Sequence, residues 1–351
     1  MNRSIFCCPI CQNAVVFHNK SISCKECQKS WNFCYGIPDF SDRDHYWNQV
    51  PQIQMQKLIE QAEEIGWRAA LNHFFDNYNQ YNYIKNYIFD ETRADWSYFI
   101  PLSSNSIVLD MGCGWGAVSV GLARTAGIVY AVDSTFETLR FLNIRAYQDG
   151  ISNLVPLKLN PLDYPKFPFQ NSTFDLIVLN GVLEWVGTVR RDKNPSEIQR
   201  RALREIFNLL KPGGYIYIGI ENRYYLGLLL GSRIHHELPF ISILPRKLSN
   251  FITRLIKKED HRTYVYSEQQ YRRLLTNTGF ASIDFYWPIP TYRSPRTIIP
   301  LSDKRIYKYW INNIMSCNTF KTKLYKLMLS RIIPSDFLCS SYGIVGKKEV
   351  S

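Results

Sequence analysis

The 351-residue sequence lacks any run of about twenty uninterrupted apolar residues, the length that a membrane-spanning helix requires. Its first residues, MNRSIFCCPIC, also lack the apolar stretch of a secretory signal peptide. We therefore expect a cytoplasmic protein. Hydrophobic residues make up 46% of the chain and aromatic residues 15%, a composition that argues for a folded protein and against disorder.

Acidic residues are scarce in the last third of the chain. From Arg223 onward there are 21 Lys and Arg against 8 Asp and Glu, whereas the preceding 222 residues contain 21 Lys and Arg and 22 Asp and Glu. The net charge of +12 therefore resides in the C-terminal third. Such a region indicates a polyanion or an anionic membrane surface as partner, or simply a solvated face. We expect peripheral contact with the inner face of the membrane, with RNA as the less favoured partner because Arg-Gly repeats are absent.

Disulfide bonds are not expected in the cytoplasm, yet six of the nine cysteines fall within the first 34 residues. Cys8 and Cys11 form one Cys-x-x-Cys pair, and Cys24 and Cys27 form a second pair after twelve intervening residues. This spacing is typical of a four-thiolate zinc site. Because four protein ligands leave no position for water, the sequence predicts a structural Zn²⁺ ion rather than a catalytic one.

Three nearby residues are alternative ligands, namely Cys7, His18 and Cys34, and Cys7 is the alternative to Cys8. The segment YGIPDF is expected to end this zinc ribbon at a Gly-Ile-Pro turn. Residues 41–98 then carry apolar positions at helical spacing, as in MQKLIEQAEEIGWRAALNHFF. They predict a helical connector that packs on the following domain.

Glycines recur at alternate positions after the apolar strand predicted over residues 106–109. Gly112, Gly114 and Gly116 follow Asp110 and precede an amphipathic helix, AVSVGLAR. Glycine lets a ligand lie against the backbone, and the helix N-terminus offers unpaired N–H groups to a carboxylate. The Gly-x-Gly-x-x-Gly spacing of dinucleotide-binding folds is absent. The pattern therefore predicts a different cofactor.

Further strands follow at regular intervals. A second strand ends at Asp133, whose carboxylate is suited to accept both ribose hydroxyls or to cap the next helix. A third is expected to end at Asp163, followed by Tyr164, and a fourth, TFDLIVLN, ends at Asn180. An amphipathic helix and a Pro-Gly-Gly turn precede a fifth strand, and ASIDFYWPIP and SSYGIVGKK supply two more.

In this order, residues 106–222 resemble the motifs of class I S-adenosylmethionine-dependent methyltransferases. The resemblance implies an α/β fold with a seven-stranded, mostly parallel Rossmann-like sheet. It also implies that S-adenosylmethionine lies over Gly112 to Gly116, with its ribose on Asp133 and its adenine beside Asp163 and Tyr164. Asp110 and Asn180 complete the cofactor residues that the resemblance implies.

Members of that family that methylate exocyclic amino groups of bases or glutamine side chains carry an (Asn/Asp)-Pro-Pro-(Tyr/Phe) motif after the fourth strand. This sequence has NGVL there, from Asn180, which makes such amines less expected acceptors. Glu184 and Glu221 follow strand ends, where active sites of open sheets form, so each is a candidate general base or a helix cap. His235 and His236 are further catalytic candidates, and Asn222 and His261 also belong to the acceptor side.

A second resemblance is carried by the segments GIPDF, RADW, VLNGVLEWVG, GIENRYYLG and FYWPIPTYRSPRTIIPL. Through these segments, nearly the whole chain resembles bacterial zinc-ribbon methyltransferases of surface glycan and lipid-linked saccharide assembly. This resemblance implies O-methylation of a sugar or phosphosugar, with a small-molecule or lipid-linked saccharide as acceptor. An RNA methyltransferase acting on rRNA or tRNA and a non-enzymatic cofactor-binding partner protein remain alternatives.

Four parts of the chain are expected. They are a zinc ribbon (1–40), a helical connector (41–100), a cofactor-binding core (101–222) and a C-terminal part (223–351) with a cap insertion, the last sheet elements and a basic extension. Apolar and basic residues mix in the insertion, which predicts either a substrate-covering cap, the reading we favour, or a lid lying in a membrane interface.

Overall fold

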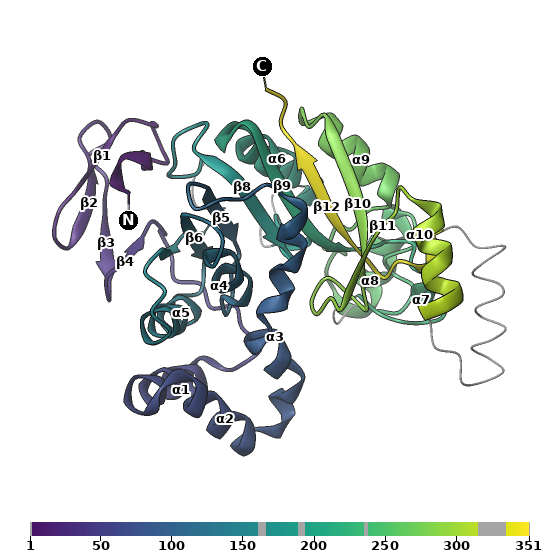
Figure 1. Cartoon of the computed structure of the whole chain (residues 1–351), viewed down its shortest axis with the longest axis horizontal. Helices are drawn as coiled ribbons and strands as arrows, with labels where there is room; N and C mark the ends of the chain where they lie inside the picture. Colours follow the sequence, from purple (N-terminus) through teal and green to yellow (C-terminus); the bar gives the residue numbers. More distant parts are fainter. Residues whose placement is uncertain (1, 161–165, 189–193, 235–237, 315–334, 351) are drawn as a thin grey trace. The chain divides into compact units, whose positions relative to one another are not determined.

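The computed structural model describes residues 2–160, 166–188, 194–234, 238–314 and 335–350 (Figure 1). Two compact units divide the chain. The first comprises Met1–Leu179, Glu205–Tyr215 and Lys348–Ser351, and the second comprises Asn180–Arg204 and Ile216–Lys347. Within the described ranges, none of the helices has both the length and the apolar character needed to cross a membrane. The four predicted domain boundaries stay predictions.

A small antiparallel sheet opens the first unit, drawn in purple in Figure 1. After a 3-10 turn, η1 (Arg3–Ile5), its strands are β1 (Val15–Phe17), β2 (Ser21–Cys24), β3 (Ser30–Cys34) and β4 (Ile37–Asp39). The chain reverses at Tyr35 and Gly36, whose φ angles are 49° and 77°. The expected Gly-Ile-Pro turn is therefore wrong. Ile37 is buried and pairs with Cys34, so the residues after the reversal form a fourth strand.

Strand β4 joins this ribbon to the central strands of the first unit. Asp39 pairs in parallel with Lys158, the last residue of β7 (Leu154–Lys158). The Lys158 ammonium lies 3.1 Å from a carboxylate oxygen of Asp39 and 2.6 Å from one of Asp44. Because Lys158 is only 3% exposed, its charge needs these two carboxylates. The ion pairs thus hold the ribbon at the edge of β7.

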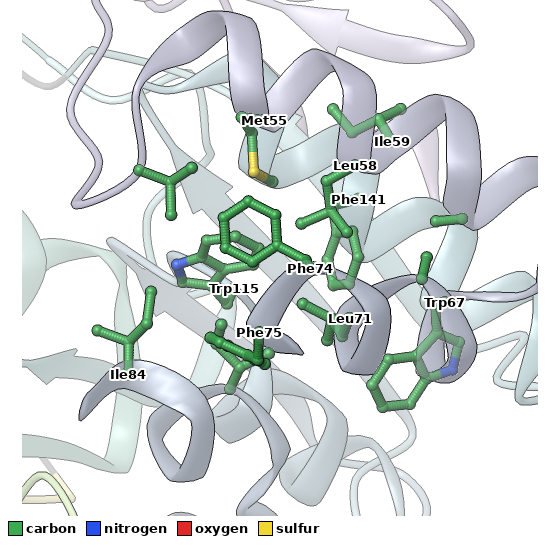
Figure 2. Close-up of a cluster of buried hydrophobic side chains, with 14 residues drawn as sticks. Met55, Leu58, Ile59, Trp67, Leu71, Phe74, Phe75, Ile84, Trp115 and Phe141 are labelled. Carbon is green, nitrogen blue, oxygen red and sulfur yellow. The ribbon is translucent and has the colours of Figure 1, made fainter. Parts of the chain in front are cut away.

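The connector is a series of short helices, as predicted. They are α1 (Gln52–Ile65), α2 (Trp67–Asn77), the 3-10 helix η2 (Asn79–Ile84), α3 (Lys85–Phe89) and the 3-10 helix η3 (Glu91–Phe99). Helices α1 and α2 contact each other and α5 (Phe136–Gln148). They share one apolar cluster with Trp115 of the glycine turn and Phe141 of α5 (Figure 2). Burial of this cluster therefore fixes the connector against the turn.

The central strands of the first unit are β5 (Ile107–Met111), β6 (Ile128–Asp133), β7 and β8 (Phe174–Asn180). β5 pairs in parallel with both β6 and β8, and β6 pairs in parallel with β7. Helix α4 (Ala117–Ala123) follows β5 and contacts β6, while α5 contacts β6 and β7. Val108, Leu109 and Met111 of β5 are buried and Ile107 is half-buried, which agrees with the expected strand covered on both faces.

The second unit contains most of the remaining elements. They are η4 (Leu183–Trp185), α7 (Leu226–Leu229), α8 (Arg246–Lys257), α9 (Glu268–Thr276), β10 (Ser282–Ile289), β11 (Thr297–Pro300), α10 (Lys304–Tyr309), a π-helical turn η5 (Trp310–Ile314), α12 (Ser335–Leu338) and β12 (Ser341–Lys347). Three elements have residues in both units, namely β8, whose last residue Asn180 belongs to the second unit, α6 (Pro195–Leu209) and β9 (Leu210–Glu221). β10 pairs antiparallel with both β11 and β12.

The mixed sheet has twelve strands, in the order β1-β2-β3-β4-β7-β6-β5-β8-β9-β12-β10-β11, so the prediction of seven was wrong. The seven expected strands are β5 to β10 and β12. The others are the four ribbon strands, which β4 attaches to β7, and β11 beside β10. The Pro-Gly-Gly segment also differs from the prediction because it lies within β9. There the left-handed Gly213 (φ 79°) donates its N–H to the Lys348 carbonyl at 3.0 Å.

Candidate cofactor, metal and acceptor sites

The glycine turn after β5 adopts a backbone that favours glycine at each of its three glycine positions. The φ angles of Gly112, Gly114 and Gly116 are 73°, 52° and 80°, all in the left-handed region. A Cβ on Gly116 would also overlap the side chain of Leu142 on α5, whereas one on Gly114 would meet only Tyr87 Oη, at 3.8 Å. Gly116 thus serves packing, whereas Gly114 has room for a Cβ atom in ordinary van der Waals contact with Tyr87.

Asp133 holds this turn from the end of β6. Its Oδ2 accepts the Gly114 N–H at 2.9 Å, and its Oδ1 accepts the Thr135 N–H at 2.8 Å. Burial raises the pKa of Asp133, against the lowering effect of these two hydrogen bonds. A carboxylate offers about four acceptor positions, so both oxygens keep capacity for the predicted ribose hydroxyls. The structure places Asp133 beside the glycine turn, and its contact with a cofactor stays a prediction.

Asp110 faces the interior rather than the surface of the turn. It is 1% exposed, and its Oδ2 accepts a hydrogen bond of 2.5 Å from Ser119 Oγ on α4. Burial raises the pKa of Asp110 to about 6, although the Ser119 hydroxyl and the charge of Arg93 oppose the shift. Asp110 therefore ties α4 to β5, and its predicted contact with the cofactor stays a prediction.

The connector supplies two residues near the turn that sequence reasoning did not single out. A Cβ atom added to Gly114 would lie nearest to Tyr87 of α3. The Arg93 guanidinium of η3 lies 3.7 Å from the Tyr87 ring centroid and donates to the Tyr87 carbonyl at 2.9 Å. Arg93 belongs to the RADW segment, which was the available sequence signal. Tyr87 is therefore a candidate wall of the cofactor site.

The predicted adenine residues, Asp163 and Tyr164, lie outside the described residues. The third expected strand, β7, ends at Lys158. The Lys158 side chain is held there by its two ion pairs, with Asp39 at the end of β4 and with Asp44. Sequence reasoning missed the C-terminal end of β7 because Asp39 and Asp44, which pair with Lys158, lie more than a hundred positions away in the sequence.

The four predicted cysteine ligands form one cluster. The ligand sulfurs of Cys8, Cys11, Cys24 and Cys27 all lie within 4.8 Å of one another. The Cys8–Cys27 and Cys11–Cys24 Sγ distances are 3.9 and 3.6 Å. A tetrahedral zinc with Zn–S bonds of about 2.3 Å needs sulfurs about 3.8 Å apart. The cluster is therefore compatible with Zn²⁺.

The rival ligands stand apart from this cluster. Cys7 pairs in a β-bridge with Ala14, and His18 Nε2 lies 3.0 Å from Ser23 Oγ. Neither these two residues nor Cys34 belongs to the group of four sulfurs found in the described part of the chain. Cys8 rather than Cys7 is thus the ligand candidate.

In the second unit, Glu221 at the end of β9 is the centre of a polar cluster. Its Oε1 accepts a hydrogen bond from Tyr292 Oη at 3.0 Å and forms an ion pair of 3.1 Å with Arg293. Arg293 Nε also donates to Tyr292 Oη at 3.3 Å. Burial, followed by the charges of Glu221 and Glu184, raises the pKa of Tyr292. Tyr292 therefore remains a neutral hydrogen-bond donor to the Glu221 carboxylate.

Glu184 of η4 belongs to the same cluster and is 0% exposed. Burial first, and then the negative charge of Glu221, raise the pKa of Glu184 well above its usual value. The proximity of the Glu221 carboxyl group thus favours the protonated form of Glu184. Two carboxyl groups in such contact do not both ionise readily. Glu184 is therefore the protonated member, and Glu221 is the ion-paired one.

Asn180 adjoins this cluster because two glycines leave room for it. A Cβ on Gly219 would overlap Asn180 Oδ1 and would lie 3.1 Å from Tyr292 Cδ2, and one on Gly181 would lie 2.9 Å from Tyr292 Oη. Asn180 is 8% exposed, and its amide oxygen and nitrogen have no hydrogen-bond partner among the described residues. Because an unsatisfied buried amide is costly, Asn180 is suited to bind a polar ligand. Tyr292, Arg293 and Gly219 were missed by sequence reasoning.

Two other acceptor-side candidates, Asn222 and His261, contact residues outside this cluster. Asn222 donates from Nδ2 to the Cys339 carbonyl at 2.9 Å and accepts the Tyr224 N–H at 3.0 Å, so it fixes the backbone after β9. His261 Nδ1 lies 2.9 Å from Arg246 Nη1 at the start of α8. His235 and His236 lie outside the described residues.

Residues 109–218 match the family model of the methyltransferase domain. Residues 109–218 form a class I S-adenosylmethionine-dependent methyltransferase domain. This methyltransferase domain includes the glycine turn, Asp133, Asn180 and Glu184. The expectation of such a domain from motif order is confirmed.

Several known proteins are similar to this chain. The ubiquinone biosynthesis O-methyltransferase of Citrobacter koseri is 25% identical over 174 residues, 44% of this chain and 63% of that protein. The corresponding protein of Haemophilus ducreyi is 24% identical over 60% of this chain and 75% of its own length. A solved S-adenosylmethionine-dependent methyltransferase from Methanosarcina mazei has a TM-score of 0.43 at 18% identity, covering 71% and 95% of the two chains. The chain spans 63% of the length of the Citrobacter koseri protein and 56% of the length of the corresponding protein of Xanthomonas euvesicatoria.

Mutation of the cysteine cluster tests its ability to hold metal. We expect the purified protein to contain one zinc ion per chain and the Cys24→Ser variant to lose it, since a tetrahedral site needs all four thiolates. Cys34→Ser is the matched control, because Cys34 lies in the same ribbon but outside the cluster. Metal content is measured by plasma mass spectrometry. Zinc retained in Cys24→Ser, or lost equally from both variants, would contradict the assignment.

The protonated state of Glu184 predicts a pH-dependent stability. The pKa of Glu184 in the folded protein is raised above the ordinary 4.5. The contribution of Glu184 to the free energy of unfolding is therefore fully present below pH 4.5 and is lost as pH rises through the folded pKa. Relative to Glu184→Gln, which stays neutral and keeps a hydrogen-bond donor, the wild type should therefore lose free energy of unfolding as pH increases above 4.5. Urea denaturation at a series of pH values measures the difference. Parallel curves for the two proteins would show that Glu184 is ionised in the folded state.

Proposed function

We propose that this chain transfers a methyl group from S-adenosylmethionine to an oxygen of a sugar or phosphosugar. The methyltransferase domain at residues 109–218 is the observation that carries the reaction type. The relatives from Citrobacter koseri and Haemophilus ducreyi are named O-methyltransferases, which supports oxygen as the accepting atom. The sugar itself is supported by the resemblance to zinc-ribbon methyltransferases of glycan assembly, and a lipid-linked saccharide is one form that it takes.

The glycine turn supports the cofactor part of this proposal. Bound S-adenosylmethionine supplies an electrophilic methyl carbon on a positively charged sulfur. The space beside Gly114 is bounded in the side-chain direction by the Tyr87 hydroxyl, and main chain without side chains admits the methionine end. We assign the ribose hydroxyls to the remaining acceptor positions of Asp133. Asp163 and Tyr164 are proposed to adjoin the adenine.

The polar cluster of the second unit supports an acceptor that must lose a proton. Glu221 is held by Arg293 and Tyr292, which orient its carboxylate, and Glu184 beside it already carries a proton. We assign to Glu221 the role of accepting the proton of the sugar hydroxyl. Asn180, with its buried amide, is proposed to orient a polar group of the ligand. General-base assistance of this kind contributes about 10²–10⁴-fold in rate.

The four-thiolate cluster is proposed to hold one structural Zn²⁺ ion. Its support is the separation of the sulfurs, which suits a tetrahedron, together with the Cys-x-x-Cys spacing. The ribbon pairs with β7 through β4, so the ion would stabilise the sheet edge on which that pairing depends.

An acceptor screen tests the function. The protein is incubated with S-adenosylmethionine carrying a labelled methyl group and with separated glycan, lipid-linked saccharide, RNA and protein fractions of cells. We expect base-stable label in a saccharide fraction, because an O-methyl ether is not hydrolysed by base. Label in RNA would replace the proposal by RNA methylation. Cofactor binding without label in any fraction would favour a non-enzymatic partner protein.

Cofactor binding is tested separately by Asp133→Ala. We expect the variant to lose binding of S-adenosylmethionine in calorimetry, because it lacks both the ribose acceptor and the partner of the Gly114 N–H. Asp76→Ala, at an exposed position on α2, is the control and should bind as the wild type does. Thermal melting shows whether each variant is folded. Unchanged affinity in a folded Asp133→Ala protein would remove Asp133 from the cofactor site.

A further inference from the structure

Helix α8 (Arg246–Lys257) is amphipathic, but its apolar side is exposed to solvent. Leu248, Phe251 and Leu255 fall on one side of a helix with about 100° per residue, and they are 44%, 60% and 69% exposed. The opposite side carries Ser249 and Thr253, which are buried. A surface helix of a globular protein normally shows the reverse arrangement.

Specific hydrogen bonds hold the polar side of α8 inward. Ser249 Oγ donates to the Ile241 carbonyl, which precedes the helix, at 2.8 Å. At the first turn, Arg246 donates to the carbonyl of His261 at 2.8 Å and lies over the Tyr264 ring. The helix is thus fixed in the orientation that leaves its apolar side exposed.

The segment before α8 adds exposed apolar side chains of its own. Leu230 and Phe240 are both exposed, and the Phe240 ring lies 3.7 Å from the position of a Cβ on Gly231. Phe240 has a φ of 64°, in the left-handed region that a bulky side chain rarely adopts. Such a conformation costs of order 1 kcal/mol and persists only where the surroundings fix it. Its neighbour Ile241 is the residue that accepts the Ser249 hydroxyl.

Basic residues flank the apolar side of α8. From Arg246 to Lys258 the sequence contains five Lys and Arg and no Asp or Glu. At the same helical spacing, Lys247, Arg254 and Lys258 project next to Phe251, and Arg254 forms an ion pair with Asp260 at 2.5 Å. Long basic side chains beside apolar ones suit a lipid interface, because their stems follow the apolar region while their charges reach the head groups.

We propose that the exposed side of α8 binds the surface of an anionic lipid bilayer, with Leu248, Phe251 and Leu255 in the interface and the flanking basic residues against the head groups. This inference does not depend on the proposed reaction. A second copy of the chain suits the surface poorly, because a symmetric contact would bring Lys247, Arg254 and Lys258 against the same basic residues. An anionic bilayer satisfies the apolar and the basic residues together.

The test uses the full-length protein and sedimentation with vesicles of phosphatidylglycerol and phosphatidylcholine in equal parts. We expect binding to these vesicles, and at least about tenfold weaker binding to pure phosphatidylcholine, because each basic residue near an anionic surface contributes to affinity. The Phe251→Ser/Leu255→Ser double variant should bind the anionic vesicles at least about tenfold more weakly than the wild type.

Tyr83→Ser/Tyr147→Ser is the matched control, since it removes two highly exposed aromatic side chains from the first unit. It should bind vesicles as the wild type does, and all variants should keep their melting temperature and their calorimetric affinity for S-adenosylmethionine. Absence of wild-type binding to anionic vesicles, or equal binding by both double variants, would overturn the proposal. A wild-type dimer in analytical ultracentrifugation that Phe251→Ser/Leu255→Ser dissociates would also overturn it, in favour of a contact between copies.

Discussion

The hydrogen bond from the Gly114 N–H to the Asp133 carboxylate joins the turn after β5 to the end of β6. The N–H groups of Gly112 and Cys113 both donate to the Val132 carbonyl at 2.7 and 3.0 Å, so the same strand end holds the turn at three points. Left-handed backbone at three glycines makes this arrangement possible, and Trp115 then enters the apolar cluster of the connector. The candidate cofactor site therefore depends on a backbone conformation that only glycine adopts without strain.

Local signals in the sequence carried much of this architecture. The strand over residues 107–111, the glycine turn, Asp133 at a strand end and the paired cysteines are all encoded within short windows, where periodicity and spacing are informative. The motif order also predicted the methyltransferase domain. These features depend on backbone geometry and ligand chemistry that neighbouring residues specify by themselves.

Features that depend on distant residues escaped prediction. The ribbon joins β7 because Asp39 and Asp44 meet Lys158, and no local pattern announces that pairing or the end of β7. Tyr87 approaches Gly114 only because the connector folds back through its apolar cluster. In the second unit, Tyr292 and Arg293 reach Glu221 from a position some seventy residues later in the chain. Pairwise contacts of this length are decided by tertiary packing, so composition and periodicity contain no signal for them.

Helix α8 shows the same limit, because its sequence pattern fits both an interfacial helix and a substrate-covering cap, the interpretation that the sequence favours. The burial of Ser249 and Thr253 leaves Phe251 and Leu255 facing solvent, and this exposure supports the proposed interfacial helix. This orientation bears on the choice of acceptor that the methyltransferase domain alone leaves open. A soluble phosphosugar gains nothing from an enzyme held at a bilayer, whereas a lipid-linked saccharide is confined to that surface and meets the enzyme at a raised effective concentration. Of the two acceptor forms proposed, the exposed side of α8 therefore favours the lipid-linked one.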